Sequence, residues 1–398
     1  MKTKYFLNMG RSAAIVLGIG YALSASAANS RTFTDAMDIK LTNNSYSLTT
    51  ADLMGNGKQD IIAGDGSVLI NTSPGDGSVS FTPGPSVPAA QWVTTADING
   101  DGKPDLIEAN ETNQVAVFIN TTQPGDTVPS FAAPVYFNAG GAVSMVVATD
   151  VNGDNLPDLL AIDSDNNAVD VLINTTIPGD TNVTFSNFQG FQGGNNVNWI
   201  AAGDLNGDGM ADIVAVNNID NTISVYINTM AQGDTTPSFA LQQVFTAGNV
   251  PNSVVIADIN GDGNADVVIG NDGDSYISVL LNTTPNLSTT VSFAPEQTFA
   301  TGSVPMAVVA ADVDGDGRLD IIAGNNQDST VSVLMNTTAA QSSTASFDTQ
   351  EVFGVGVDPE DIVAADLNGD GKIDFAVMDS AGYAGWPSVT ALINVPNN

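Results

Sequence analysis

Short acidic segments of nine residues recur seven times along the chain. Their first residues lie 45, 53, 54, 54, 54 and 54 positions apart, and repetition at such a period indicates a tandem structural repeat. The segments read DLMGNGKQD from Asp52, DINGDGKPD from Asp97, DVNGDNLPD from Asp150, DLNGDGMAD from Asp204, DINGDGNAD from Asp258, DVDGDGRLD from Asp312 and DLNGDGKID from Asp366.

Each segment places hard oxygen donors at fixed positions. Positions 1, 3, 5 and 9 carry carboxylate or amide groups, and position 7 can add a main-chain carbonyl, a ligand set typical of Ca²⁺. Soft and borderline metals prefer nitrogen or sulfur, and the chain has no His and no Cys. Asp, Asn and Gly also form turns without a metal. Because a turn does not need a second fixed aspartate at position 9, the sequence favours calcium loops over plain turns.

The seven loops are not equally complete. Met54 and Asn56 occupy positions 3 and 5 of the first copy, so this loop, with Asp52, Asn56 and Asp60, is expected to bind calcium weakly or not at all. Six loops remain as calcium sites, and Asp314 makes the sixth copy the most acidic. The predicted ligands, with position 7 supplying its carbonyl, are Asp97, Asn99, Asp101, Lys103, Asp105, Asp150, Asn152, Asp154, Leu156, Asp158, Asp204, Asn206, Asp208, Met210, Asp212, Asp258, Asn260, Asp262, Asn264, Asp266, Asp312, Asp314, Asp316, Arg318, Asp320, Asp366, Asn368, Asp370, Lys372 and Asp374.

The composition excludes several classes of function. The 398 residues include 44 Asp and Glu against 9 Lys and Arg, and a net charge of −35 repels nucleic acid and anionic lipid surfaces. Without His or Cys there is no disulfide, no thiolate zinc site and no Ser-His-Asp triad. The 42% of hydrophobic residues is enough for a large core, which distinguishes the chain from a disordered acidic tail.

Residues 1–27 have the pattern of a cleaved secretory signal peptide. They begin with a basic stretch, continue with an apolar run over residues 13–23 and end in Ala25-Ser26-Ala27. An uncleaved membrane anchor is the alternative, but the apolar run is shorter than the ~20 residues that span a bilayer. We expect residues 28–398 to be exported to the periplasm, the cell surface or the medium without inserting into the membrane.

The elements that position the loops are short strands. Each repeat contains four apolar, strand-length runs separated by Gly, Asn, Asp and Pro, with no run at helical period. Four strands in each of seven units predict an all-β, seven-bladed β-propeller of four-stranded antiparallel blades. Each unit begins with the outermost strand of a blade, so residues 33–41 should pair with residues 391–394 of the last blade and close the ring. An open solenoid is the alternative, but it would need capping repeats, which are not visible.

Two further patterns recur within the repeats. Phenylalanines six positions apart, such as Phe239 and Phe245, share one face of a strand and predict stacking between neighbouring sheets. Asn-Thr-Thr or Asn-Thr-Ser follows the third strand in five repeats and matches a glycosylation acceptor, although its fixed place in the repeat favours a turn. These asparagines are Asn71, Asn120, Asn174, Asn282 and Asn336.

With D-x-[ND]-G-D-G-x-x-D between the first two strands of four-stranded units, the chain resembles the FG-GAP/VCBS-type repeats, which include the propeller of integrin α subunits. The resemblance covers residues 33–394. It implies a seven-bladed propeller with calcium in the loops of one face, most often in exported binding or adhesion proteins. The Phe-Gly and Gly-Ala-Pro signatures survive only in fragments such as Ala323-Gly324, so membership of the integrin branch is not expected.

The aromatic residues suggest a ligand site on the face opposite the loops. Trp92 and Trp199 lie five residues before their nonapeptides, and Tyr383 and Trp386 lie in the longest connection between second and third strands. Alternating strand directions place all four on the face without calcium. Aromatic rings among polar side chains suit a sugar or a protein hot spot. The alternative is that the tryptophans fill the central channel.

The sequence therefore predicts an exported calcium-binding propeller that serves as a binding or adhesion module for extracellular glycan or protein. A carbohydrate-active enzyme is one alternative: a hydrolase could work with carboxylates alone, whereas a lyase would need a base and cationic groups near its substrate. A structural surface or matrix component is another. The carboxylates available on the putative ligand face are Asp163, Asp165, Asp220, Asp272, Asp274, Asp328, Asp361 and Asp379.

Overall fold

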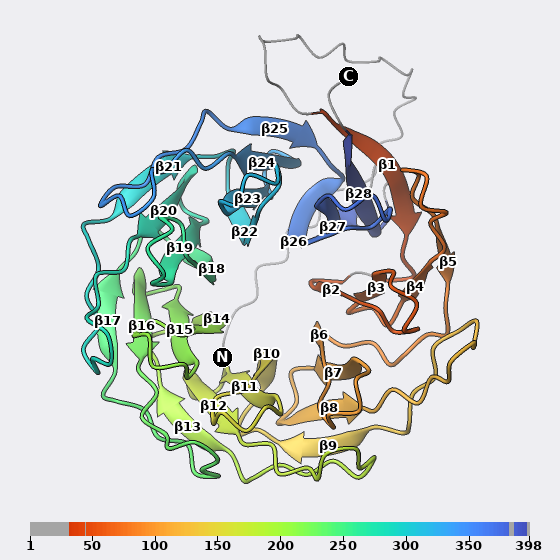
Figure 1. Ribbon diagram of the computed structural model, residues 1–398, viewed down its shortest axis with the longest axis horizontal. Coiled ribbons are helices and arrows are strands. Elements are labelled where there is room, and N and C mark those ends of the chain that lie inside the picture. Colours follow the sequence, from red (N-terminus) through yellow and green to blue (C-terminus); the bar gives the residue numbers. More distant parts are fainter. Residues whose placement is uncertain (1–31, 44, 382–385, 396–398) are drawn as a thin grey trace, which may run out of the picture.

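The computed structural model describes residues 32–43, 45–381 and 386–395. The predicted signal peptide, residues 1–27, lies outside the described residues. The described chain forms seven four-stranded antiparallel sheets arranged as blades around a central axis (Figure 1). The predicted all-β, seven-bladed propeller is thus confirmed. Within the described residues no helix is long and apolar enough to cross a membrane.

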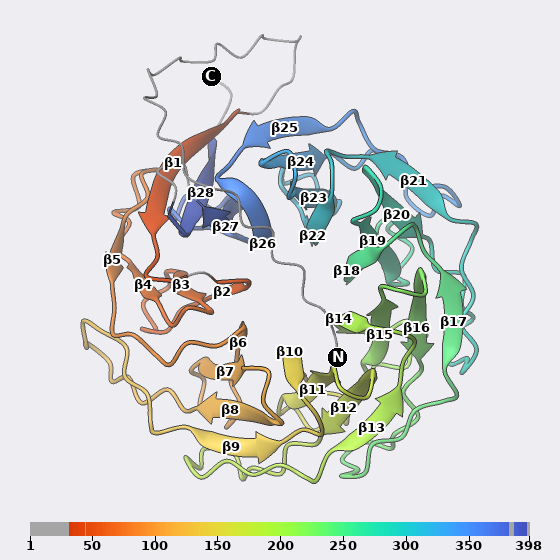
Figure 2. The ribbon, with the colours of Figure 1, turned by 180° about the vertical axis from the view of Figure 1, so that it is seen from behind.

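Blades 1 to 6 follow the chain from the axis to the rim, as both views of the ring show (Figures 1 and 2). Blade 1 contains β2 (Leu48–Ala51), β3 (Asp60–Ala63), β4 (Val68–Asn71) and β5 (Phe81–Pro83), and blade 2 contains β6 (Trp92–Ala96), β7 (Asp105–Ala109), β8 (Gln114–Phe118) and β9 (Val135–Asn138). Blade 3 contains β10 (Val143–Thr149), β11 (Asp158–Asp163), β12 (Ala168–Leu172) and β13 (Gln189–Gln192), and blade 4 contains β14 (Val197–Gly203), β15 (Asp212–Asn217), β16 (Thr222–Tyr226) and β17 (Gln243–Thr246). Blade 5 contains β18 (Pro251–Ala257), β19 (Asp266–Asn271), β20 (Tyr276–Leu280) and β21 (Gln297–Ala300), and blade 6 contains β22 (Pro305–Ala311), β23 (Asp320–Asn325), β24 (Thr330–Leu334) and β25 (Glu351–Gly354).

Blade 7 joins the two ends of the described chain. It contains β26 (Val357–Ala365), β27 (Asp374–Ala381) and β28 (Ser388–Val395), and its outermost strand is β1 (Thr32–Lys40). Strand β1 pairs antiparallel with β28, with Phe33 opposite Asn394. The predicted closure of the ring by the N-terminal strand is therefore confirmed. Closure pairs an edge of blade 7 that would otherwise remain open.

The core lies between neighbouring blades, where the apolar faces of the sheets meet. Phenylalanine side chains contact each other near the rim at five of the seven junctions, which confirms the predicted contact between sheets. The prediction that both phenylalanines of one repeat share a face is wrong: Phe239 contacts Phe191 of blade 3, whereas Phe245 contacts Phe293 of blade 5. The two residues do not lie on one continuous strand, because β17 begins only at Gln243. At the other two junctions, Ile39 and Phe81 pack against one apolar cluster, and Val87 and Phe131 pack against another. The stacked pairs are Phe33–Phe353, Phe137–Phe185, Phe191–Phe239, Phe245–Phe293 and Phe299–Phe347, with ring centroids 4.8–5.0 Å apart.

Candidate metal loops and the opposite face

All seven nonapeptides lie on one face of the ring. Each connects the first strand of its blade to the second; residues 97–105, for example, lead from β6 into β7. Because every blade repeats the same strand directions, the loops gather on the face that receives the end of each first strand. The predicted position of the loops is thus found in the structure.

Within a loop, the side chains of positions 1, 3 and 5 are held by the loop's own backbone. In the second loop, Asp97 accepts hydrogen bonds from the main-chain N–H groups of Asp101 (3.0 Å) and Gly102 (2.7 Å). Asn99 also accepts from Asp101, at 3.2 Å, and Asp101 accepts from Lys103 at 3.0 Å. These turns place the carboxylate and amide groups of alternate residues around one centre.

Position 6 of each loop has a positive φ, a backbone conformation that favours glycine. Gly102 has a φ of 85°, and Asn155 takes the same place in the third loop with a φ of 70°. Asparagine tolerates this left-handed region better than other non-glycine residues, so the third loop keeps the fold of its neighbours. The first loop also keeps it, with Asp52 accepting from Asn56 and Gly57, although Met54 supplies no oxygen at position 3.

The aspartate of position 9 is fully enclosed and clamps two segments of backbone. Asp105 Oδ2 accepts from Ile98 N (2.9 Å), and Oδ1 accepts from Asn120 N (2.8 Å) at the end of the third strand. The same two hydrogen bonds occur in all seven blades. This structural role, which sequence analysis missed, explains the invariant second aspartate independently of any metal.

Burial makes the position 9 carboxylates unusual acids. Desolvation raises the pKa of each, and the negative charges of nearby loop aspartates add to the shift. The pKa is raised to about 7 in Asp105, Asp158 and Asp212, and to about 6 in Asp60, Asp266, Asp320 and Asp374.

The asparagine that ends each third strand joins neighbouring loops. Asn120 Nδ2 donates to Pro104 O of its own loop (3.0 Å) and to Leu53 O of the preceding blade's loop (3.1 Å), while Asn120 Oδ1 accepts from Thr122 N (2.9 Å). The turn interpretation is confirmed, and the buried amide has no space for a sugar. Asn228 and Asn394 are the equivalent asparagines of blades 4 and 7. They do not match the glycosylation motif, because Thr-Met and Val-Pro follow them.

A second set of contacts docks four of the loops, the second to the fifth, to the following blade. Gly233 N, in the connection between β16 and β17, donates to Asn152 O of the third loop (2.7 Å). Equivalent bonds run from Gly179 N to Asn99 O and from Leu287 N to Asn206 O. Each of these four loops is thereby fixed to the blade that follows it.

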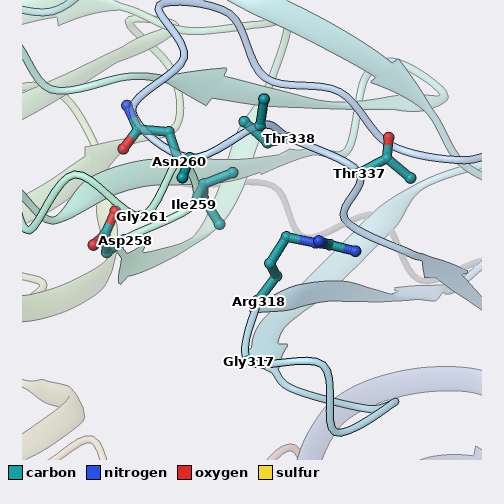
Figure 3. A pocket seen from close by; sticks show the side chains of 10 residues that line it. Asp258, Ile259, Asn260, Gly261, Gly317, Arg318, Thr337 and Thr338 are labelled. Atoms are coloured by element: carbon teal, nitrogen blue, oxygen red, sulfur yellow. The ribbon is translucent and has the colours of Figure 1, made fainter.

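The densest group of carboxylates lies in the sixth loop. Asp312, Asp314 and Asp320 each offer an oxygen within 4.8 Å of the others, and all are hard donors that suit a calcium-type cation. Beside this loop, a pocket of about 300 Å³ opens toward the fifth loop, with Asp258 on one side and Arg318 on the other (Figure 3). Arg318 is held by its own blade: it pairs with Asp316 and its Nε donates to Asn336 O at 2.6 Å.

On the opposite face, the structure separates the predicted aromatic residues. Trp92 of β6 and Trp199 of β14 meet edge to face, with ring centroids 5.0 Å apart and planes at 88°, and both pack against the apolar cluster that contains Met145 of the intervening blade. Trp386 is 56% exposed and lies over Lys40 Nζ of β1, 3.9 Å from the ring centroid. Tyr383 lies outside the described residues. The Trp92–Trp199 contact supplies a packing role, and ligand binding by these residues stays a prediction.

Most acidic side chains on that face accept hydrogen bonds from main-chain N–H groups. Asp165, Asp220, Asp274 and Asp328 each accept a main-chain N–H from the segment that enters from the preceding blade. Asp361 accepts from Leu48 N (2.9 Å) and thereby joins blade 7 to blade 1, while Asp379 accepts from the hydroxyl of Thr390. Asp272 and Asp379 each have a buried Oδ1 without a hydrogen-bond partner, and burial raises the pKa of Asp272 to about 6 and that of Asp379 to about 7.

Known structures share the ring architecture. BBS1N, solved in complex with ARL6DN, has a TM-score of 0.59 at 10% identity and covers 92% of this chain and 98% of its own. A lectin from Agrocybe aegerita that recognises non-reducing terminal N-acetylglucosamine has a TM-score of 0.54 at 19% identity, covering 78% and 80%. A putative 6-phosphogluconolactonase from Bacteroides uniformis has a TM-score of 0.53 at 11% identity, covering 87% and 96%. These identities establish similarity of fold alone.

Sequence comparison identifies the repeat. No curated protein matches the chain significantly. The family model of the FG-GAP-like repeat matches residues 52–108, 97–161, 150–215, 204–269 and 258–323, with each match beginning at the first aspartate of a loop. The resemblance deduced from the loops is thereby confirmed, and the chain belongs to the FG-GAP-like repeat family as a seven-bladed β-propeller.

Proposed function

We propose that this protein is an exported, calcium-stabilised propeller that binds an extracellular glycan or protein. The observation that carries the calcium part is the repetition of oxygen-rich loops on one face, with three carboxylate oxygens of the sixth loop within 4.8 Å of one another. Export to the periplasm, the cell surface or the medium follows from the signal-peptide pattern of residues 1–27.

The donor chemistry of the loops fits calcium. The side chains of positions 1, 3, 5 and 9 would hold the ion with the carbonyl of position 7, and the hydrogen bonds on the position 9 carboxylate leave it lone pairs for a cation. Bound calcium would neutralise carboxylates that burial and mutual repulsion otherwise destabilise. Sites of ~10⁻⁴ to 10⁻³ M affinity would each add roughly 0.6–1.8 kcal/mol to the free energy of unfolding at ~2 mM calcium.

Calcium titration of the chelated protein, followed by thermal unfolding, tests this part. We expect the melting temperature to rise with calcium and the rise to shrink in the double variant Asp312→Asn with Asp316→Asn. Asp348→Asn, an exposed position outside the loops, is the matched control and should keep the full response. A melting temperature that does not respond to calcium would remove the ion from the proposal.

The binding part rests on the aromatic residues opposite the loops. Trp386 is largely exposed, and Trp92 and Trp199 lie on innermost strands near the axis. Related folds include a lectin that recognises N-acetylglucosamine and a propeller solved in complex with a protein, which supports both ligand classes. Glycan-array binding of Trp386→Ala, Trp92→Ala and Trp199→Ala tests it, with Tyr136→Ala at the exposed rim as control. If all four variants bind glycans equally well, the tryptophans have only a packing role.

A carbohydrate-active enzyme is the less favoured alternative. Seven of the eight carboxylates considered for acid–base chemistry already accept hydrogen bonds from backbone or hydroxyl donors. Asp272 remains, and glycoside hydrolysis needs two carboxyl groups in one cleft. A polysaccharide-hydrolysis assay of Asp272→Asn against wild type separates the two functions: a hydrolytic activity lost in this variant would favour the enzyme. The structural matrix alternative would instead require calcium-dependent self-association without any ligand.

A further inference from the structure

A buried polar pair recurs between the second and third strands of the blades, at the end remote from the nonapeptide loops. In blade 4, Asn217 Nδ2 donates to Ser224 Oγ at 2.8 Å, and in blade 7 the Thr390 hydroxyl donates to Asp379 at 2.6 Å. All of these side chains are buried, and one hydrogen lies between the two partners in every case. The pairs in blades 5 and 6 are Asn271–Ser278 and Asn325–Ser332.

Blade 3 carries two carboxyl groups at these positions. Asp163 ends β11, and Asp170 lies in the middle of β12 with an exposure of only 1%. Asp170 Oδ2 is buried and has no hydrogen-bond partner. A Cβ added to Gly140 would lie 2.1 Å from Asp170 Oδ2 and 2.7 Å from Asp163 Oδ2, so the two oxygens face the same small space. Two ionised carboxylates would leave no hydrogen between them.

The two carboxyl groups have opposite environments. Asp163 accepts four hydrogen bonds, from Gly141 N (2.8 Å), Asp165 N (3.0 Å), Asn166 N (2.9 Å) and Asn166 Nδ2 (2.7 Å). Burial tends to raise the pKa of Asp163, but these donors together outweigh it and hold the pKa below its usual value. Burial, and then the charge of Asp163, raise the pKa of Asp170 to about 7. A proton on the pair therefore resides on Asp170.

Within the described part of the chain, no basic side chain lies beside this pair. Asp170 lies opposite Ala161 on β11 and Gly190 on β13, and blade 2 covers this face with Val115 and Val117. Two further acidic residues of the described chain lie at this end of the blade: Asp165, whose carboxylate accepts from Ala142 N, and Glu111 of blade 2, whose main-chain N–H donates to Val143 O opposite Asp163. Among the described basic residues, Lys40 belongs to blade 7 and the others lie in the nonapeptide loops of the opposite face: Lys58, Lys103, Arg318 and Lys372.

We propose that Asp163 and Asp170 form a carboxylic acid–carboxylate pair that binds one proton and locks the loop between β11 and β12, releasing it as the pH rises. In the locked state Asp170 Oδ2 donates its proton to Asp163, which remains the acceptor for Gly141 and Asn166. No bond other than O–H is made or broken, and the proton leaves to water.

The loop that this pair controls connects three blades. Through Asp163 it holds Gly141, at the entry from blade 2. Through Asn167 it holds blade 4, because Asn167 O accepts from Gly193 N (2.8 Å) and Asn167 Oδ1 accepts from Asn196 N (2.9 Å). Loss of the shared proton would place two negative charges in a dry site and loosen this part of the face.

The test compares wild type with Asp163→Asn/Asp170→Ser, which installs the pair found in blades 4, 5 and 6. Melting temperatures are measured from pH 5 to pH 9 in the presence of a chelator. Because the folded-state pKa of Asp170 is raised, its contribution to the free energy of unfolding is fully present below pH ~4 and is lost as the pH rises through ~7. We expect the double variant to gain stability relative to wild type across this interval, while Asp180→Asn, which removes a single exposed carboxylate, follows wild type. A difference that stays constant with pH overturns the proposal.

A second measurement does not depend on how the double variant folds. Infrared difference spectra between pH 5 and pH 9 should contain the carbonyl bands of all buried carboxyl groups that titrate in this interval, Asp105 and Asp158 among them, and the band of wild type should exceed that of Asp170→Asn by the intensity of one carboxyl group. Bands of equal intensity in the two proteins overturn the proposal. A metal ion in place of the proton would also overturn the proposal. In that case, adding Na⁺ or Ca²⁺ at pH 9 would restore the stability of wild type and would not restore that of Asp170→Asn.

Discussion

The side-chain amide of Asn71 in blade 1 donates a 2.9 Å hydrogen bond to the main-chain carbonyl of Leu367 in blade 7, across the point where the ring closes. The equivalent asparagine of every other blade makes the same bond to the loop of the blade before it. A closed ring of seven amides thus joins the nonapeptide loops. It complements the closure by β1 and β28, because it acts on the loop face.

Loss of one amide should weaken two blades together. Asn228→Ala removes the donor to Val151 O (2.7 Å) and Ala211 O (3.0 Å), and leaves buried carbonyl groups without that partner. We expect the free energy of unfolding to fall by about 3 kcal/mol in urea titrations. Asn182→Ala, at an exposed turn, is the control and should change it by less than about 0.5 kcal/mol. Equal effects of the two substitutions would contradict a role for the amide ring.

The first loop should accept a designed calcium site. Its backbone already has the hydrogen bonds of the other loops, with Asn56 N 2.9 Å from Asp52 Oδ1, but Met54 supplies no oxygen. Met54→Asn with Asn56→Asp restores the missing donors, so equilibrium dialysis should find one more bound calcium per chain than in wild type. Met54→Leu is the matched control and should bind the wild-type number. An unchanged stoichiometry in the double variant would show that the donor set is not what limits this loop.

A larger side chain at the junction between blades 1 and 2 should increase the stability of the protein. Val87 stands where five other junctions have a phenylalanine, and a groove of about 470 Å³ lined by Val87 and Phe131 provides space beside it. Val87→Phe should add about 1 kcal/mol to the free energy of unfolding through an edge-to-face contact with Phe131. Phe191→Val, the converse change at the Phe191–Phe239 pair, should remove about 1–3 kcal/mol. Destabilisation by Val87→Phe in thermal unfolding would mean that the groove cannot receive the ring.

Glu108 should make the protein less stable as the pH rises. It lies in β7, where the corresponding position holds alanine in four other blades, and burial raises its pKa to about 8. Because its folded-state pKa is raised, the contribution of Glu108 to the free energy of unfolding is fully present below pH ~4.5 and is lost as the pH rises through ~8. Glu108→Ala should therefore gain up to about 4 kcal/mol relative to wild type between pH 5 and pH 9. Chelated samples unfolded by urea at several pH values provide the measurement, and parallel pH profiles would refute the assignment.

The sequence by itself determined the architecture and the placing of the loops. The repeat period, four strands in each unit and the outermost strand at the start of each unit are local patterns, and they were sufficient for seven blades closed by β1. The recurring phenylalanines predicted contacts between sheets, but not their faces: Phe239 and Phe245 contact opposite neighbouring blades, because the chain between them is not one continuous strand and period-two alternation does not apply to it. Calcium binding, export and the ligand role of the tryptophans stay predictions.

Only the tertiary structure decided which residues meet across blades. Asn228 reaches a carbonyl 77 residues away, Trp92 meets Trp199 over an intervening blade, and Asp163 and Asp170 face one space beside Gly140. No local pattern encodes these contacts, because they depend on how far each sheet twists and how closely neighbouring blades pack around the axis. The second aspartate of each loop shows the difference: its spacing was visible in the sequence, whereas its two backbone hydrogen bonds exist only once the third strand lies beside the loop.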